Sequence, residues 1–146
     1  MDPDVRTIEE QVALLLRLAD RNRRRSSRFD GTLERSAYLA LGRLVDGPLS
    51  INEIADHLRL DASTVTRQVL AMEAAGHVTR ERDEHDGRRA VISMTPAGAQ
   101  ALAATQAARY DVYREILEDW GAADRHQLGA LLTRLNAELD AGTRVR

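Results

Sequence analysis

The sequence contains no cysteine among its 146 residues. Disulfide bonds, thiol nucleophiles, thiolate metal sites and cysteine-based redox switches are therefore excluded. No apolar run approaches the ~20 residues that are needed to cross a bilayer, and the chain does not open with a signal-peptide pattern. From these absences we expect a cytoplasmic protein.

Aromatic side chains make up only 3% of the chain. A ligand pocket lined by several rings is therefore not indicated. If an effector binds to aromatic side chains, the candidates are Tyr38, Tyr110 and Tyr113. Lysine is absent as well, so all 21 basic residues are arginine. Arginine is the better side chain for bidentate contacts with phosphate and guanine. The net charge of −2 does not itself favour nucleic-acid binding. Whether the protein can bind nucleic acid therefore depends on how its charges are distributed.

Residue groups that are typical of catalysis are missing too. The sequence shows no Ser/His/Asp set, no glycine-rich phosphate loop and no metal-ligand spacing. Its four histidines are scattered, and lone histidines are more often surface or core residues than ligands. We therefore expect that the protein is not an enzyme and that it holds no metal and no cofactor.

Apolar residues recur at helical spacing over most of the chain. The predicted helices span about residues 4–25, 33–45, 50–58, 62–75 and 96–120, with a last helix after Gly121. Two short strands are predicted at residues 78–82 and 90–94. The predicted fold class is mainly α with a small β-hairpin wing (α+β), because helix, turn, helix and hairpin in that order form a winged helix-turn-helix.

Capping signals mark several of these helix boundaries. Ser50-Ile-Asn-Glu53 reads as a capping box, in which serine and glutamate satisfy each other's backbone amides. Asp61 is the predicted N-cap of the fourth helix, and Gly76 is the predicted residue after its end. Thr95-Pro96 predicts the start of the fifth helix.

The fourth helix has the pattern of a recognition helix. At 100° per residue, one side gathers Ala62, Val65, Val69 and Met72, which should dock on the third helix. The opposite side and its flanks carry the predicted DNA contacts, Ser63, Thr64, Thr66, Arg67 and Gln68. An ordinary solvated face would mix glutamate and arginine, but no acid occurs between Ala62 and Met72. Arg67 could grip O6 and N7 of a guanine.

The predicted hairpin turn carries a second set of arginines. Asp86-Gly87-Arg88 should form its tip, with Asp86 holding the Arg88 guanidinium so that Arg88 projects into a narrow minor groove. Arg89 is a further predicted DNA contact. A plain hairpin turn with a weak surface ion pair is the alternative interpretation. Glu81, Asp83 and Glu84 also make the hairpin acidic in places, which would oppose phosphate binding.

The densest charge run is formed by arginines between Arg21 and Arg28. It could be a solvated helix end, because arginines near a helix C-terminus are favoured by the helix dipole. It could also be a phosphate clamp or a counter-charge for an acidic effector. The sequence leaves these three interpretations open.

Taken in order, these motifs resemble those of the MarR (multiple antibiotic resistance regulator) family of bacterial transcription factors. The resemblance rests on Ser63-Thr-Val-Thr-Arg-Gln-Val69, Gly76-His-Val78, Asp86-Gly-Arg88 and Met94-Thr-Pro-Ala-Gly98. It extends over nearly the whole chain through flanking helices of suitable length. The absence of cysteine sets the chain apart from thiol-switch members, and no compact His/Asp/Glu cluster suggests the zinc-sensing branch.

The resemblance implies a homodimer in which residues 1–32 and 96–146 form a helical dimerisation region. Residues 33–95 would form the DNA-binding domain. It also implies binding to a pseudo-palindromic operator in double-stranded DNA, repression of transcription, and modulation by a small-molecule effector. By family position, Ser63, Thr64, Thr66, Arg67 and Gln68 meet the major groove, and Arg88 enters the minor groove.

A second function belongs to another class of protein. The acidic residues of the hairpin suggest a winged helix that serves as a protein-interaction or ligand-binding module and has lost its contact with DNA. Alanine at Arg67 and Arg88 would separate the two functions, because partner binding that ignores these side chains would favour the module.

Overall fold

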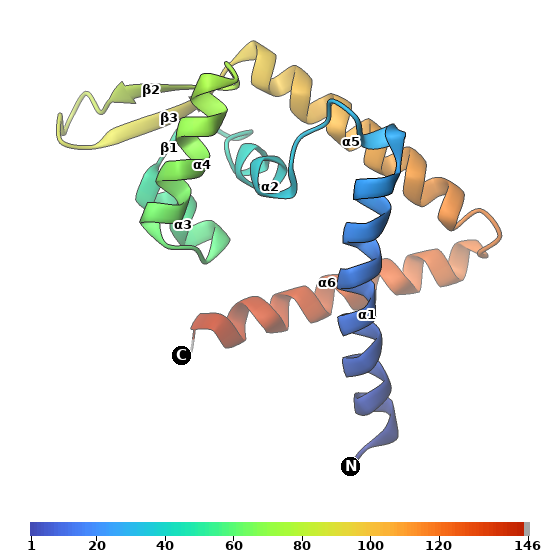
Figure 1. The fold of residues 1–146 in the computed structure, drawn as a ribbon. Helices are drawn as coiled ribbons and strands as arrows, with labels where there is room; N and C mark the ends of the chain where they lie inside the picture. Colours follow the sequence, from blue (N-terminus) through green and yellow to red (C-terminus); the bar gives the residue numbers. More distant parts are fainter. Residues whose placement is uncertain (145–146) are drawn as a thin grey trace. The chain divides into compact units, whose positions relative to one another are not determined.

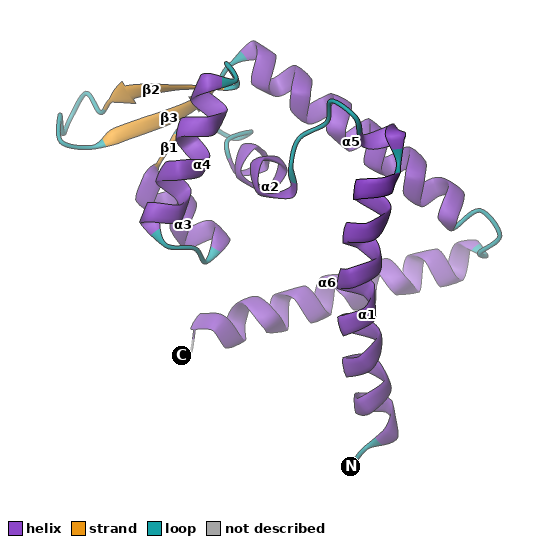
Figure 2. Cartoon of the chain, in the orientation of Figure 1, coloured by secondary structure: helices purple, strands orange, loops and turns teal. Residues whose placement is uncertain are grey.

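The structure, a computed structural model, describes residues 1–144 and divides the chain into two units, residues 1–32 and residues 33–146. The first unit holds α1 (Pro3–Arg25) and the 3-10 helix η1 (Ser27–Phe29). The second unit contains a winged helix-turn-helix followed by two long helices (Figures 1 and 2). Its elements are α2 (Arg35–Arg43), β1 (Leu49–Ser50), α3 (Ile51–Leu58), α4 (Ala62–Ala74), β2 (Val78–Arg82), β3 (Ala90–Met94), α5 (Pro96–Ile116) and α6 (Ala122–Arg144). The predicted fold class is confirmed.

Helix α1 confirms the first predicted helix almost to the residue. Asp2 caps it, because its Oδ1 accepts from the backbone N of Asp4 at 2.8 Å, and Pro3 occupies the first turn. The helix buries none of its residues within this chain, although leucines cover much of its surface. Its last turn carries Arg23, Arg24 and Arg25, where the helix dipole favours positive charge.

Two predicted helices end earlier than their apolar spacing suggests. The helix predicted over 33–45 is the shorter α2, and the helix predicted over 96–120 ends at Ile116. After Ile116 the backbone tightens, because Glu118 N donates to Glu115 O and Trp120 N donates to Leu117 O. A guanidinium N–H of Arg125, from the first turn of α6, donates to Trp120 O. Apolar residues continue through this turn, so periodicity alone placed the helix end too late.

The helix-turn-helix begins with the predicted capping box. Ser50 Oγ accepts from Glu53 N at 3.2 Å, and Glu53 Oε1 accepts from Ser50 N at 3.2 Å. The turn to α4 passes through Arg59, which adopts the left-handed conformation with φ 55°. Asp61 occupies the N-cap position of α4 as predicted, but its side chain makes no capping hydrogen bond. Its backbone O accepts from Val65 N at 3.1 Å.

The C-terminal end of α4 is a Schellman motif. Gly76 N donates to Glu73 O at 3.0 Å, and His77 N donates to Met72 O at 2.9 Å. Gly76 has φ 79°, a conformation that side chains with a Cβ disfavour. This reversal sends the chain directly into β2, so the predicted role of Gly76 is confirmed.

A three-stranded antiparallel sheet forms the wing. Strands β2 and β3 have the predicted bounds and pair from Val78↔Met94 to Arg82↔Ala90. The order is β1-β3-β2, so the short strand β1, which the sequence analysis missed, pairs with β3 through Leu49↔Ile92 and Ser50↔Val91. Two residues are too few to show an alternating pattern.

The core of the second unit lies where α2, α3 and α4 meet the sheet and the start of α5. It consists of Ala40, Leu41, Leu44, Ile54, Ala55, Val65, Val69, Met72, Val78, Ile92 and Leu102. The three predicted docking residues Val65, Val69 and Met72 are buried. Ala62, which was predicted to dock with them, is exposed because it lies in the first turn of α4, beside the turn that joins α3 to α4.

Helix α5 begins at the predicted residue, because Thr95 Oγ1 accepts from Gly98 N at 3.0 Å and Pro96 occupies the first turn. The same hydroxyl joins this end to the winged helix-turn-helix by donating to Gly76 O at 2.6 Å. Further along, the buried Thr105 accepts from Leu33 N at 3.0 Å. Among the residues of the described chain, 1–144, none of the helices has the length and apolar content of a membrane-spanning segment.

Gly98 is the position at which a methyl group should be most harmful. A Cβ there would lie 2.1 Å from His77 O and 3.1 Å from Met94 Cγ. We expect Gly98→Ala to lower the free energy of unfolding by roughly 1–3 kcal/mol, the range of overpacked cores. Gly42→Ala is the matched control, because its Cβ would meet no atom within 4 Å. Urea denaturation should show the Gly42→Ala protein stabilised by up to about 1 kcal/mol. Equal effects of the two substitutions on the free energy of unfolding would contradict the close approach at Gly98.

Candidate nucleic-acid interface

The orientation of α4 follows from which of its residues are buried. Val65, Val69 and Met72 face the core, so the opposite side of the helix faces away from the protein. Ser63 and Arg67 lie on that side and are exposed, as predicted. The accessible end of the face therefore offers a hydroxyl and a guanidinium one helical turn apart, a pair that can contact phosphate and base edges.

Two threonines flank this face. Thr64 and Thr66 are both half-buried, and Thr66 Oγ1 donates to Ala62 O at 2.8 Å within the helix. The hydroxyl proton of Thr66 is therefore already used. Because a phosphate oxygen can only accept, Thr66 would have to break this bond before donating to DNA.

Gln68 is the third predicted contact on the flanks of this face. It is half-buried, and its side-chain Oε1 is buried without a hydrogen-bond donor among the described residues. Its carboxamide oxygen is therefore not available to DNA in this conformation. An unpaired buried carbonyl costs about 1–3 kcal/mol.

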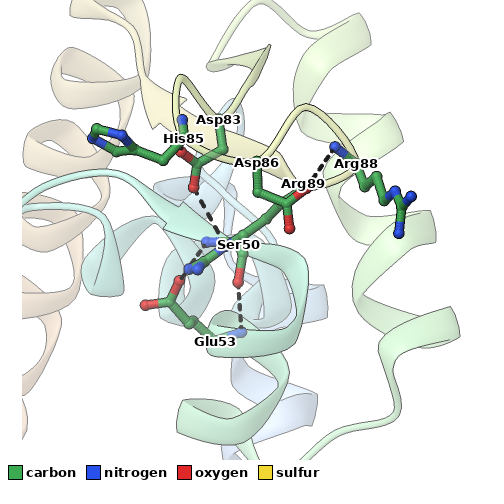
Figure 3. Close-up of polar contacts among 7 residues, drawn as sticks. All are labelled: Ser50, Glu53, Asp83, His85, Asp86, Arg88 and Arg89. Atoms are coloured by element: carbon green, nitrogen blue, oxygen red, sulfur yellow. Dashed lines mark hydrogen bonds and ion pairs between the residues drawn. The ribbon is translucent and has the colours of Figure 1, made fainter.

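The tip of the wing is built by its own acidic residues (Figure 3). Asp83 Oδ1 accepts from His85 N at 2.9 Å, and Asp86 Oδ1 accepts from Arg88 N at 3.0 Å. Backbone bonds close the loop, since Asp83 N donates to Arg89 O and Arg89 N donates to Asp86 O. These carboxylates therefore hold the turn in shape.

The two neighbouring wing arginines have different environments. The side chain of Arg88 extends away from the carboxylates of the turn, and Asp86 accepts from its backbone amide (Figure 3). The predicted contact of Asp86 with the Arg88 guanidinium is therefore replaced by a backbone contact. Arg89 points back toward α3, where its guanidinium pairs with Glu53 and lies 3.9 Å from Asp83 Oδ2. Arg89 was predicted to contact DNA, but in the free protein its charge is already paired.

The three tyrosines predicted to contact an effector differ in their exposure. Tyr38 is half-buried, with the Arg109 guanidinium 4.9 Å from its ring centroid. Tyr110 is 68% exposed and Tyr113 is 44% exposed. Three surface cavities of about 250, 620 and 460 Å³ lie elsewhere, beside α2 and α3 and between α3 and the wing.

Two contacts between distant residues were not foreseen from the sequence. Glu53 was recognised only as a capping residue, although it also pairs with Arg89. Arg59, in the turn of the helix-turn-helix, pairs with Asp140 of α6 at 3.1 Å. Both pairs join segments that lie far apart in the chain, and no local pattern relates residues at such separations.

Comparison with known proteins identifies this architecture. The model of the MarR family matches residues 32–89. The helix-turn-helix transcriptional regulator YxaD of Bacillus subtilis is 36% identical over 136 residues, which cover 90% of this chain and 92% of YxaD.

Solved structures show the same fold. A mutant of MarR from E. coli, solved in complex with operator DNA, has a TM-score of 0.73 at 17% identity, over 92% of this chain and 99% of that one. BpsR of Bordetella bronchiseptica, solved to explain how 6-hydroxynicotinic acid regulates its DNA binding, has a TM-score of 0.67 at 21% identity. That match covers 87% of this chain and 94% of BpsR. Together with the family model and the similarity to YxaD, the winged helix-turn-helix shows that this chain belongs to the MarR family of DNA-binding transcriptional regulators.

Proposed function

We propose that this regulator acts as a homodimer on a pseudo-palindromic operator, where it represses transcription until a small molecule releases it. The observation that carries this proposal is the outward face of α4, where Ser63 and Arg67 are exposed and no acidic side chain occurs before Glu73. The exposed side chain of Arg88, which extends away from Asp86 in Figure 3, would supply a second contact. The protein would act in the cytoplasm, where bacterial DNA lies.

Each recognition helix would lie in a major groove of the operator. Arg67 would bind a guanine through two parallel hydrogen bonds, and Ser63 and Thr64 would contact phosphates or base edges near the start of the helix. Arg88 would enter the adjacent minor groove, where a narrow groove favours its charge. In a symmetric dimer the two half-sites would lie about 34 Å apart, one turn of the double helix.

Apolar side chains on the terminal helices support the dimer. In α1, Leu14, Leu15, Leu16 and Leu18 are exposed, and in α6 so are Leu131, Leu132 and Leu139. A large amount of exposed apolar surface is typical of a protein interface. We propose that residues 1–32 and 96–146 bury these side chains against a second copy of the chain.

The acidic residues of the wing suggested an alternative function, that of a protein-interaction or ligand-binding module that does not bind DNA. In the structure two of these acids, Asp83 and Asp86, accept backbone hydrogen bonds within the turn. These two carboxylates therefore have structural partners and do not require a basic protein partner to explain them. The comparisons also favour regulators that bind DNA.

For the effector we propose a small organic molecule that contacts Tyr38 and its neighbours on α5. The ring of Tyr38 and the guanidinium of Arg109 are stacked, and together they could bind an aromatic or anionic group. Tyr110 and Tyr113 follow Arg109 on α5 and would contribute once the dimer is formed. BpsR, which has the same fold, responds to an aromatic acid.

Replacing the two outward arginines tests the DNA interface. We expect Arg67→Ala to weaken binding to the operator by roughly 5- to 150-fold and to relax preference for one base, because a bidentate guanine contact contributes about 1–3 kcal/mol. Arg88→Ala should also weaken binding and reduce the slope of log affinity against log salt by about 1. Fluorescence anisotropy on a fragment from the protein's own upstream region measures both. Arg43→Ala, at an exposed arginine of α2 outside both proposed interfaces, is the control, and equal losses in all three variants would refute specific recognition.

A charge on the terminal helices tests the dimer. Leu131 is 54% exposed in the single chain, and burying a glutamate there against a partner would be costly. We expect Leu131→Glu to shift the protein toward the monomer in sedimentation velocity. Val45→Glu, at a site that is 57% exposed but outside the terminal helices, should leave the dimer intact. A Leu131→Glu protein that stays fully dimeric at micromolar concentration would place the interface elsewhere.

A further inference from the structure

The carboxylate of Glu53 has two partners in different parts of the winged unit. Its Oε1 accepts from Ser50 N at 3.2 Å, which completes the capping box at the start of α3. The same oxygen pairs with a terminal guanidinium nitrogen of Arg89 (Figure 3). The capping box restricts where the carboxylate can lie, because Ser50 Oγ also accepts from Glu53 N at 3.2 Å. Arg89 therefore meets an acceptor that is already held in place.

The loop that Arg89 closes lies beyond the paired part of the wing. Strand β3 pairs with β1 through Leu49↔Ile92 and Ser50↔Val91. Its pairing with β2 ends at Arg82↔Ala90. Past that pair, the loop of residues 83–89 is held together by bonds to Asp83 and Asp86. These internal bonds shape the turn but do not attach it to the rest of the protein. The pair between Arg89 and Glu53 does attach it, and the attachment is on α3.

The attachment acts on the residue that follows Arg88 in the chain. Figure 3 shows the side chains of Arg88 and Arg89 leaving the loop in opposite directions. Arg89 is bound to α3, whereas Arg88 is exposed. Arg89 has a second acidic neighbour within the loop, because Asp83 Oδ2 lies 3.9 Å from Arg89 Nε.

We propose that Glu53 is a positioning residue for DNA recognition: it anchors the wing through Arg89 and thereby aims Arg88 at the minor groove. This inference rests on the proposed function of Arg88. It also gives Arg89 a different role from a phosphate contact. Surface ion pairs contribute little to folding stability, and both side chains are more than two-fifths exposed. The consequence of the pair should therefore appear in loop order and DNA affinity rather than in unfolding.

Glu53→Gln separates the two roles of this residue. A glutamine at this position of a capping box can still accept from Ser50 N, but it has no charge to hold Arg89. Ser50→Ala is the matched control, because it removes the capping hydroxyl but keeps the carboxylate and the backbone amide that donates to it. Urea denaturation should show Glu53→Gln close to the wild type and Ser50→Ala destabilised. Both variants can then be compared as folded proteins.

The first measurement uses the free protein. We expect amide hydrogen exchange of residues 83–89 to become faster in Glu53→Gln while exchange in the middle of α3 stays unchanged. Ser50→Ala should show the reverse pattern. Unchanged exchange of the loop in Glu53→Gln would overturn the anchoring role. This result does not depend on DNA, so it decides the anchor even if no operator is bound and the proposed function fails.

The second measurement is operator affinity in a double-mutant cycle. We expect Glu53→Gln to weaken binding by about two- to tenfold, the cost of ordering one or two side chains on binding. In an Arg88→Ala background the same change should have little effect, because there is no wing arginine left to aim. An equal loss in both backgrounds would overturn the positioning role. Tighter binding by Glu53→Gln would also overturn it, since the released Arg89 would then be contacting phosphate.

Discussion

The helical pitch of α4 is the constraint on which the rest of the structure depends. With 3.6 residues per turn, burying Val65, Val69 and Met72 leaves one direction for the opposite side of the helix, and that side carries Ser63 and Arg67. A shift of one position in the buried set would rotate Arg67 by about 100° and remove it from the exposed side. The core and the proposed DNA-binding surface are therefore two consequences of the same packing.

The wing shows how a protein with a net negative charge can present positive charge locally. Two of its acidic residues, Asp83 and Asp86, accept hydrogen bonds from backbone amides in the turn. Glu53 serves both the capping box and Arg89. What extends outward from the loop end is Arg88 (Figure 3). The charge that matters for recognition is thus local, and the overall charge of −2 is a poor guide to it.

Much of the fold could be predicted because its signals are short-range. The capping box at Ser50, the glycine after α4 and the strands β2 and β3 were located from residues a few positions apart. Predictions were wrong where no local sequence signal marked the end of a helix or the presence of a strand. Apolar spacing continued past the end of α5 at Ile116, and β1 was too short to show alternation. The inward carboxamide oxygen of Gln68 depends on how neighbouring elements pack around α4.

By itself, the sequence determined the helices, the hairpin and the face of α4 that is free, because periodicity and capping act over three or four residues. The tertiary structure alone decided which charges on that framework are already paired. Arg89 reaches Glu53, and Arg59 reaches Asp140, only after distant segments have packed together. Arg88 and Arg89 look alike as neighbours in the sequence. The physical reason that they differ is that a side chain's partner is set by position in space, which no local pattern encodes.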